Sequence, residues 1–126
     1  MAQNNTMAAV AYIFGWLSGL IVYLISKDDK FARFHGLQAI LWNIMMVVLM
    51  FISVVLGIVL MIVLGIVAGA ANLGGLGAIL VMLPWLLVAL FGLVLILYTL
   101  WSIYQAWSGK WHKIPLVGGL AEKWSA

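Results

Sequence analysis

Polar side chains recur at helical spacing in two otherwise apolar stretches of the chain. Three of them begin a long uncharged run, and three lie near its end: His35, Gln38 and Asn43, then Tyr98, Ser102 and Gln105. Residues three or four positions apart project from one face of a helix, and Asn43 lies at the margin of its face. Two such faces at similar depth form a polar patch. The patch predicts hydrogen bonds between helices, with Gln38 and Gln105 coupled, or alternatively a polar mouth for a solute or peptide.

His35 is the side chain of this patch best suited to proton transfer or ligand binding, because imidazole titrates near neutral pH and binds metals. Its place beside Arg33 indicates the membrane interface, and the apolar runs contain no Asp or Glu that could relay a proton. The second histidine, His112, also lies next to a lysine outside the apolar runs. We therefore expect a structural histidine, with metal or haem ligation by the two histidines as the alternative.

Catalytic chemistry finds little support elsewhere in the sequence. Asp28 and Asp29 are adjacent on an expected loop, so they share no face for acid–base work and are expected to pair with Lys27, Lys30 or Arg33. The chain has no cysteine, no nucleophile–base arrangement, no phosphate-binding glycine loop and no metal-ligand spacing. We expect no enzymatic activity and no cofactor.

The composition indicates a protein that lies in lipid. Of the 126 residues, 67% are hydrophobic and 7% charged, whereas an average soluble domain is about half apolar and about a quarter charged. The excess apolar surface must face the lipid bilayer, other membrane protein subunits or further copies of the chain. Six basic residues in short flanking stretches fit membrane orientation better than nucleic-acid binding, so no nucleic-acid partner is expected.

Apolar runs define the helices that carry the polar residues. Residues 7–25 are apolar or neutral and are just long enough to cross a hydrocarbon core of about 30 Å. The first twelve residues carry no Lys or Arg, which favours a retained span over a secretory signal. Residues 26–34 follow as a short aqueous loop, because they hold five of the nine formal charges.

The uncharged run from residue 34 to residue 109 must cross the membrane more than once. Clustered glycines with Asn72 favour a turn at residues 69–77, which places a span at about 37–67. Pro84 and Trp85 suit the start of a further span at about 84–104. Residues 73–83 are then an interfacial or shallow re-entrant segment, or alternatively the first part of a longer third helix kinked at Pro84.

These spans predict an all-α fold, a polytopic transmembrane helical bundle with three spans in a single membrane domain of residues 1–126; four spans are the alternative. Three spans place the basic residues of the 26–34 loop and of the tail, residues 108–126, on one side, which the positive-inside rule makes cytoplasmic. The N-terminus is then outside the cell (inner or plasma) membrane and the C-terminus cytoplasmic. Within the tail, a short amphipathic helix on the membrane surface is predicted by four apolar residues on one face, Leu116, Val117, Leu120 and Trp124.

Two glycine pairs have the spacing that lets helix backbones approach closely. The pairs are Gly15 with Gly19 and Gly65 with Gly69. Each predicts either oligomerisation or close packing within one subunit, and both interpretations stay open.

Two segments, 27–39 and 114–124, resemble a widespread prokaryotic family of small membrane proteins of unknown function, which is distantly similar to the Tic-twenty component of chloroplast inner-envelope protein import. The resemblance extends from Ala8 to Trp124. Its characteristic positions are Asp28, Asp29, Phe34, His35, Gln38, Ala39, Pro115, Gly118 and Glu122.

The expected function is therefore that of a non-enzymatic integral membrane protein, a small subunit, assembly factor or accessory component of a translocation-type complex. Small-residue helix faces imply partners, and a span that offers only Ser53 near mid-membrane gives no path for a charged solute. The alternative is a homo-oligomeric pore or carrier for a neutral or small solute, gated by apolar side chains.

Overall fold

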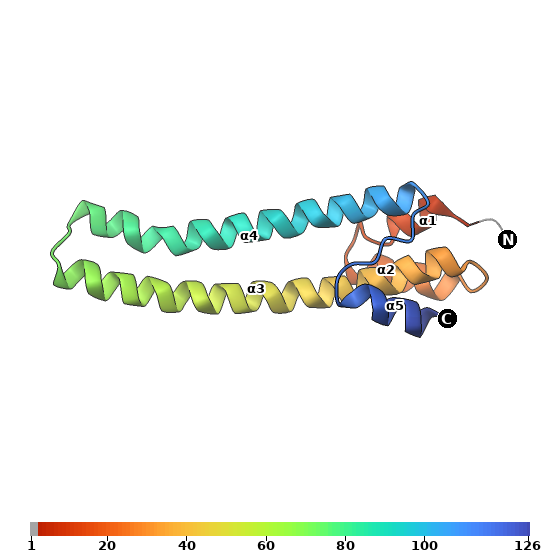
Figure 1. Ribbon diagram of the computed structural model, residues 1–126, viewed down its shortest axis with the longest axis horizontal. Helices are drawn as coiled ribbons and strands as arrows, with labels where there is room; N and C mark the ends of the chain where they lie inside the picture. Colours follow the sequence, from red (N-terminus) through yellow and green to blue (C-terminus); the bar gives the residue numbers. More distant parts are fainter. Residues whose placement is uncertain (1–2) are drawn as a thin grey trace. The chain divides into compact units, whose positions relative to one another are not determined.

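The computed structural model describes residues 3–126 and is helical in all its regular elements there (Figure 1). The helices are α1 (Asn5–Val10), α2 (Trp16–Ile25), α3 (Lys30–Ala70), α4 (Gly75–Trp107) and α5 (Val117–Ser125). The all-α fold class is confirmed. Where the sequence predicts a single domain, the chain forms two compact units: unit 1 holds residues 3–46 and 97–126, and unit 2 holds residues 47–96.

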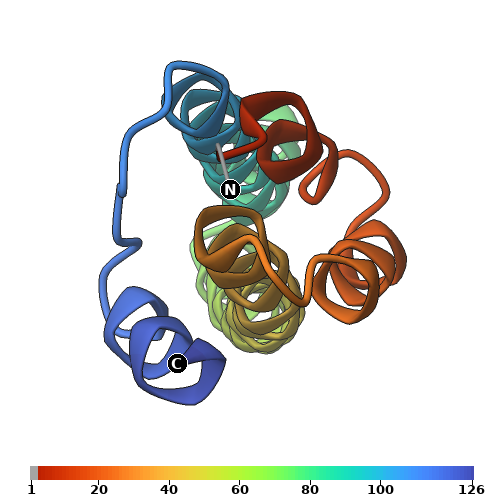
Figure 2. The same cartoon turned by 90° about the vertical axis from the view of Figure 1, so that its right-hand side faces the viewer.

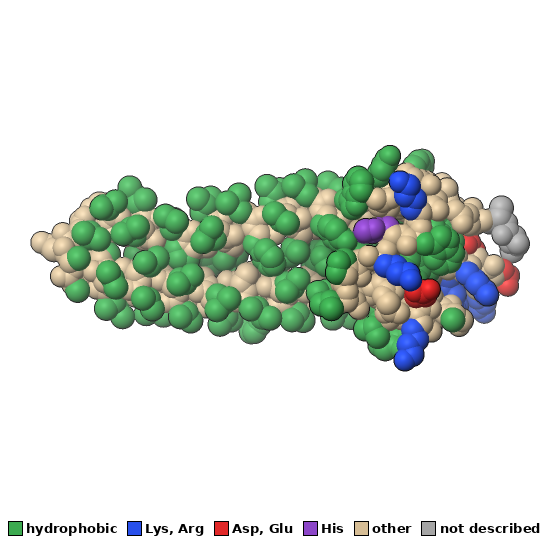
Figure 3. Space-filling model, viewed as in Figure 1, with side chains coloured by type: hydrophobic (Ala, Val, Ile, Leu, Met, Phe, Trp, Pro, Cys, Tyr) green, Lys and Arg blue, Asp and Glu red, His purple; other side chains and the backbone are tan. Residues whose placement is uncertain are grey.

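Unit 2 is a helical hairpin made from the middle and end of α3 and the first two thirds of α4. Residues 71–74 connect the helices, and the left-handed backbone of Asn72 (φ 52°) and Gly74 (φ 57°) makes the reversal tight. Hydrophobic side chains cover the hairpin (Figure 3). Most of the large ones are exposed, as expected for helices surrounded by lipid.

Two helices, α3 with 41 residues and α4 with 33, are long and apolar enough to cross a membrane. The predicted spans 37–67 and 84–104 lie within them. The prediction of a separate segment at 73–83 is wrong, because α4 already begins at Gly75 and continues through Pro84. Backbone groups in lipid have no water to bind, so the apolar residues before Pro84 form a helix, in which the backbone groups bond to one another. This agrees with the alternative prediction of a longer third helix.

The predicted span at residues 7–25 is also wrong, because the structure divides it into α1 and α2. A turn at residues 11–15 separates the two helices, and Gly15 adopts a positive φ of 65°. Ser18 stabilises the break: its Oγ accepts a hydrogen bond from Phe14 N (3.0 Å) and donates one to Ala11 O (2.8 Å). With 6 and 10 residues, neither helix can cross a bilayer that needs about 20.

Hydrogen bonds place the first described residues beside the charged loop and beside the start of the tail. Asn4 N donates to Asp29 Oδ2 (2.6 Å), and Gln3 Nε2 donates to Gly109 O (3.3 Å). A segment that crossed the hydrocarbon would hold its ends about 30 Å apart. The first described residues and the 26–34 loop therefore lie side by side, which a membrane crossing between them does not allow. The loop itself is shorter than predicted, because α3 starts at Lys30.

Close packing of glycines joins α2 to α3 within unit 1. A Cβ atom on Gly19 would lie 2.8 Å from Gly36 O, and one on Gly36 would lie 2.8 Å from Tyr23 N. Only glycine fits such a backbone approach. Viewed end-on, α2 lies on one side of α3 and α5 on the other (Figure 2). Charged side chains gather over unit 1 (Figure 3).

Candidate functional site

A buried hydrogen-bond network occupies the interior of unit 1 and contains two residues of the predicted polar patch. His35 and Gln38, one turn apart on α3, are both fully buried. The phenol of Tyr12, in the turn between α1 and α2, lies 2.7 Å from His35 Nδ1 and 2.7 Å from Gln38 Nε2. The network also includes residues 108–116, the extended segment between α4 and α5, which we call the strap.

The partners of His35 fix the direction of every bond in the network. Nε2 lies 3.0 Å from the carbonyl oxygen of Lys110, which can only accept, so Nε2 carries the proton. Nδ1 of the neutral ring therefore accepts from the Tyr12 hydroxyl, whose oxygen in turn accepts from Gln38 Nε2. Burial raises the pKa of the Tyr12 phenol, so the hydroxyl keeps the proton that this arrangement requires.

The amide of Gln38 fastens the strap to α3. Its Nε2 donates a second hydrogen bond to His112 O (2.9 Å), and its Oε1 accepts from Ile114 N (2.9 Å). Each of these backbone groups would lose its partner if the amide were removed. Gln38 thus ties the strap and the α1–α2 turn to one point on α3.

Aromatic rings surround the imidazole of His35. The rings of Phe31 and Phe34 lie 4.6 Å and 5.0 Å from it, centroid to centroid, in edge-to-face contact. Trp111 of the strap packs against both phenylalanines, at 5.1 Å and 5.3 Å. With both its nitrogens bonded and its faces covered, this histidine is structural, and neither nitrogen is free for a metal or a substrate.

Tyr98 of α4 also contacts the strap. Its hydroxyl lies 3.0 Å from His112 Nε2, and its ring packs edge-on against Trp42 at 5.4 Å. Trp42 Nε1 donates to Thr99 Oγ1 (2.8 Å). Partial burial lowers the pKa of His112, which favours its neutral form beside Tyr98. His112 is therefore the residue through which Gln38 and Tyr98 are linked, by its carbonyl and by its ring.

The remaining members of the predicted patch lie outside this network. Ser102 Oγ donates to Tyr98 O (3.1 Å) on its own helix. Gln105 is buried, yet its Oε1 has no hydrogen-bond partner among residues 3–126, and no hydrogen bond joins it to Gln38. Asn43 lies beside Gly15, where a Cβ atom would come within 3.0 Å of Asn43 Nδ2. The sequence reasoning missed Tyr12, although a phenol inside an apolar run is expected to seek a polar partner.

Asp29 and Asp28 have different roles despite their adjacency. Asp29 caps α3, since its Oδ1 accepts from Phe31 N and Ala32 N, both at 3.1 Å. Asp28 is exposed and makes no hydrogen bond or ion pair within the described chain. The expected pairing of these carboxylates with Arg33 is absent there too: Arg33 Nη2 donates to Tyr23 OH (2.9 Å).

The positions of the second family motif hold the strap and α5 in place. Pro115 lies in the strap just before α5. Gly118 packs so closely that a Cβ atom there would lie 2.5 Å from Lys113 Cβ and 2.9 Å from Gln38 Oε1. Glu122 forms an exposed ion pair with Lys113.

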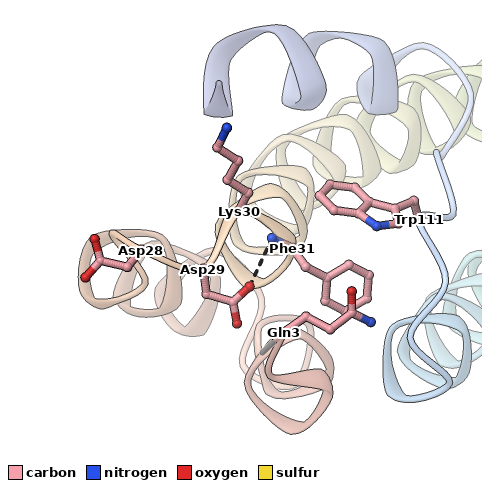
Figure 4. A pocket seen from close by; sticks show the side chains of 6 residues that line it. All are labelled: Gln3, Asp28, Asp29, Lys30, Phe31 and Trp111. Carbon is pink, nitrogen blue, oxygen red and sulfur yellow. Dashed lines mark hydrogen bonds between the residues drawn. The ribbon is translucent and has the colours of Figure 1, made fainter. Parts of the chain in front are cut away.

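A cleft of about 310 Å³ opens next to the charged loop (Figure 4). Its lining residues are Gln3, Asp28, Asp29, Lys30, Phe31 and Trp111. The side chain of Asp28 points away from the others, and the Asp29 carboxylate is bonded to Phe31 N (Figure 4). These polar groups do not converge. Across residues 3–126, no three His, Asp or Glu side chains come together in a way that could hold a metal ion.

The second glycine pair has a different environment from Gly19. A Cβ atom on Gly69 would meet no atom within 4 Å, and one on Gly65 would meet only Val81 Cγ2, at 3.9 Å. A cleft of about 320 Å³ in unit 2 is lined by these glycines together with Ala68, Asn72, Gly74, Gly77, Ala78 and Val81. Small side chains here leave space that the hairpin itself does not fill.

Comparison with known proteins identifies relatives that are named as membrane proteins. The family model of the magnetosome magnetite crystal formation protein family matches residues 3–121. A UPF0132 membrane protein of Methanocaldococcus jannaschii is 26% identical over 125 residues, covering 98% of this chain and 89% of the relative. One of Archaeoglobus fulgidus is 26% identical over 124 residues, covering 96% and 94%. No solved structure matches the chain. The chain is thus a membrane protein, and it belongs to the magnetosome magnetite crystal formation protein family.

Proposed function

We propose that this chain is a non-enzymatic membrane protein that works by association, as a small subunit, assembly factor or accessory component of a membrane complex. The observation that carries the proposal is the unfilled glycine pair of unit 2. Gly65 and Gly69 have the spacing for close helix contact, and no part of the hairpin occupies the space beside Gly69. A helix from a second copy or from another subunit fits such a surface.

The contrast with Gly19 supports this interpretation. Gly19 lies against the backbone of α3 and is needed for the fold of unit 1, whereas Gly69 is not needed for any contact within unit 2. In lipid, helices associate through close packing rather than through the hydrophobic effect. Small residues that leave open space on an apolar helix are therefore better explained by association than by folding.

The closed network of unit 1 supports a role without catalysis. The polar atoms of His35 and Gln38 are all occupied by Tyr12 and the strap, which leaves no polar mouth for a solute. Ser53 in unit 2 donates to Met50 O (2.9 Å) on its own helix. The polar groups thus serve the fold, and recognition is left to apolar surfaces.

The family description names a process in which the proposed association would act. Magnetite crystal formation is the role named in the family description. Extended to this chain, it gives a membrane component that takes part in crystal formation through its association with other subunits. A translocation-type complex, which the distant resemblance to the Tic-twenty component implies, is the other setting that we propose for this association.

We also propose a revised topology, in which α3 and α4 cross the cell membrane and both termini lie on the cytoplasmic side. The hydrogen bond between Asn4 and Asp29 supports a common side for the N-terminus and the charged loop. All six basic residues lie in the loop, at its edges or in the tail, which agrees with the positive-inside rule. The reversal at residues 71–74 is then outside.

The mass of the purified protein in detergent tests the association. We expect a mass larger than that of one chain, or a co-purifying partner, and we expect Gly69→Leu to abolish either one without lowering the thermal stability of the monomer. Gly119→Leu is the matched control, because a Cβ atom at Gly119 also meets nothing within 4 Å. A monomeric, partner-free wild-type protein would refute the proposal. Flux of a neutral solute into proteoliposomes would favour the pore instead.

A further inference from the structure

Helix α5 packs one face against the rest of unit 1 and leaves another face exposed. The face turned inward comprises Val117, Gly118, Ala121 and Ser125, all buried. The sequence predicts Val117 on the same apolar face as Leu116, Leu120 and Trp124, but the structure separates them. Val117 is only 7% exposed, whereas Leu116 is 79% and Trp124 is 54% exposed.

The free apolar residues form a stripe along the helix. Leu120 and Trp124 are four residues apart on α5, so they lie on adjacent turns of the same side, and the exposed Leu116 immediately precedes the helix. We call this set the α5 stripe. Unlike the apolar side chains of unit 2, the stripe occurs on a helix of 9 residues, which is far too short to span a membrane.

Basic side chains accompany the α5 stripe. Residues 108–126 contain Lys110, Lys113 and Lys123. Lys113 is paired with Glu122, whereas Lys110 and Lys123 are exposed and make no ion pair among residues 3–126. Figure 3 shows Lys and Arg side chains spread over unit 1, with hydrophobic side chains beside them. Apolar residues with a tryptophan, flanked by lysines, are the composition of helices that lie in the headgroup layer of anionic bilayers.

We propose that the α5 stripe docks into the headgroup layer of an anionic phospholipid leaflet, with Lys110 and Lys123 at the lipid phosphates. A lysine is attracted to an anionic surface, and its alkyl stem can lie along apolar surface while the ammonium group reaches the phosphates. This inference requires only that the hairpin is in the membrane, and it does not depend on the proposed association with other proteins.

Attachment to the rest of the chain lets a short helix act as such a contact. A free helix of this size binds lipid weakly, but α5 is held to α3 by Gln38 and the strap, and α3 is itself a membrane helix. Lipid is therefore always at high local concentration. Docking then requires only that the α5 stripe faces the anionic surface.

Single-cysteine labelling of the full chain in proteoliposomes tests the docking, because the natural chain has no cysteine. An environment-sensitive fluorophore is placed at Leu120→Cys, on the stripe, or at Glu122→Cys, on the other side of α5. Vesicles of phosphatidylcholine alone are compared with vesicles that also contain phosphatidylglycerol. Thermal unfolding of both labelled variants checks that the fold is kept.

We expect blue-shifted emission and quenching by spin-labelled lipid at position 120 in the anionic vesicles, with much smaller changes at position 122. The effect should weaken at about 1 M salt, where the Debye length falls to about 3 Å. It should also weaken when Lys110 and Lys123 are both replaced by glutamine, which leaves the Lys113–Glu122 ion pair in place. Equal emission from the Leu120→Cys label in the two kinds of vesicle, or equal quenching of the two labels in anionic vesicles, would overturn the proposal.

Discussion

Replacing Gln38 by leucine is the sharpest perturbation of the unit 1 network. The side chain is fully buried and joins Tyr12 OH, His112 O and Ile114 N through bonds of 2.7, 2.9 and 2.9 Å. Leucine has a similar volume but can make none of these bonds. The substitution therefore isolates the polar contribution from the packing contribution.

The expected cost follows from the number of bonds lost. A buried hydrogen bond contributes about 0.5–1.5 kcal/mol net, and buried backbone groups left without partners add to the penalty. Three bonds with two stranded strap groups give a decrease of about 2–4 kcal/mol in the free energy of unfolding. The loss should be local first, because the strap is held to α3 mainly by these bonds.

Two measurements check this value. Unfolding in detergent by denaturant titration gives the change in free energy, and amide hydrogen exchange of Ile114 reports the opening of the strap. Gln105→Leu is the control: it is also buried, but Gln105 Oε1 has no partner, so its removal should change stability by less than about 1 kcal/mol. With no bond joining them, the two changes should add to within about 0.5 kcal/mol. Similar costs for the two variants, or unchanged exchange at Ile114, would refute the assignment of the network.

Three further predictions concern the fold and the topology. Asp29→Ala should lower the free energy of unfolding by about 1–2 kcal/mol, because α3 loses its cap. Asp28→Ala should change the free energy of unfolding by less than about 0.5 kcal/mol, and equal effects of the two substitutions in thermal unfolding would contradict the capping role. Gly36→Ala should lower the free energy of unfolding by about 1–3 kcal/mol, because the new Cβ atom would meet the backbone of α2. Gly119→Ala should leave the free energy of unfolding unchanged or raise it. An unchanged stability of Gly36→Ala would mean that α2 can move away from α3. In intact cells, a thiol reagent that does not cross the membrane should label Asn72→Cys and spare Asn4→Cys and Lys30→Cys. Labelling of both Asn4→Cys and Asn72→Cys would instead support a membrane span at residues 7–25.

The long apolar elements were predictable from the sequence, because lipid requires every backbone group to bond within its own helix. The spans at 37–67 and 84–104 lie inside α3 and α4 for this reason. The break at residues 11–15 was not predictable from hydropathy. It depends on Ser18, whose hydroxyl satisfies backbone groups of the turn, and hydropathy does not indicate where one hydroxyl points.

Of the predicted polar patch, the structure brings together His35 and Gln38, with Tyr98 reached through His112, and their bonding partners were not predicted. Helical spacing placed His35 and Gln38 on one face, and both are indeed buried together. Their partners, however, come from Tyr12 and from backbone groups of the strap, which are distant in sequence and have no periodic pattern. A backbone carbonyl is present at every residue, so sequence alone does not distinguish Lys110 O from any other.

The two glycine pairs show how one local pattern can serve two purposes. Gly19 and Gly69 each end a pair with the same spacing, but the first lies against α3 and the second against open space. The difference arises from what surrounds each helix and not from the pair itself. The polar atoms of His35 and Gln38 are engaged within unit 1, and the surfaces that carry our two proposals are the open helix face at Gly69 and the α5 stripe. Partners of this protein should therefore be recognised by helix packing and by lipid charge, and substitutions that fill the space at Gly69 should impair function more than substitutions on the exposed loop at Asp28.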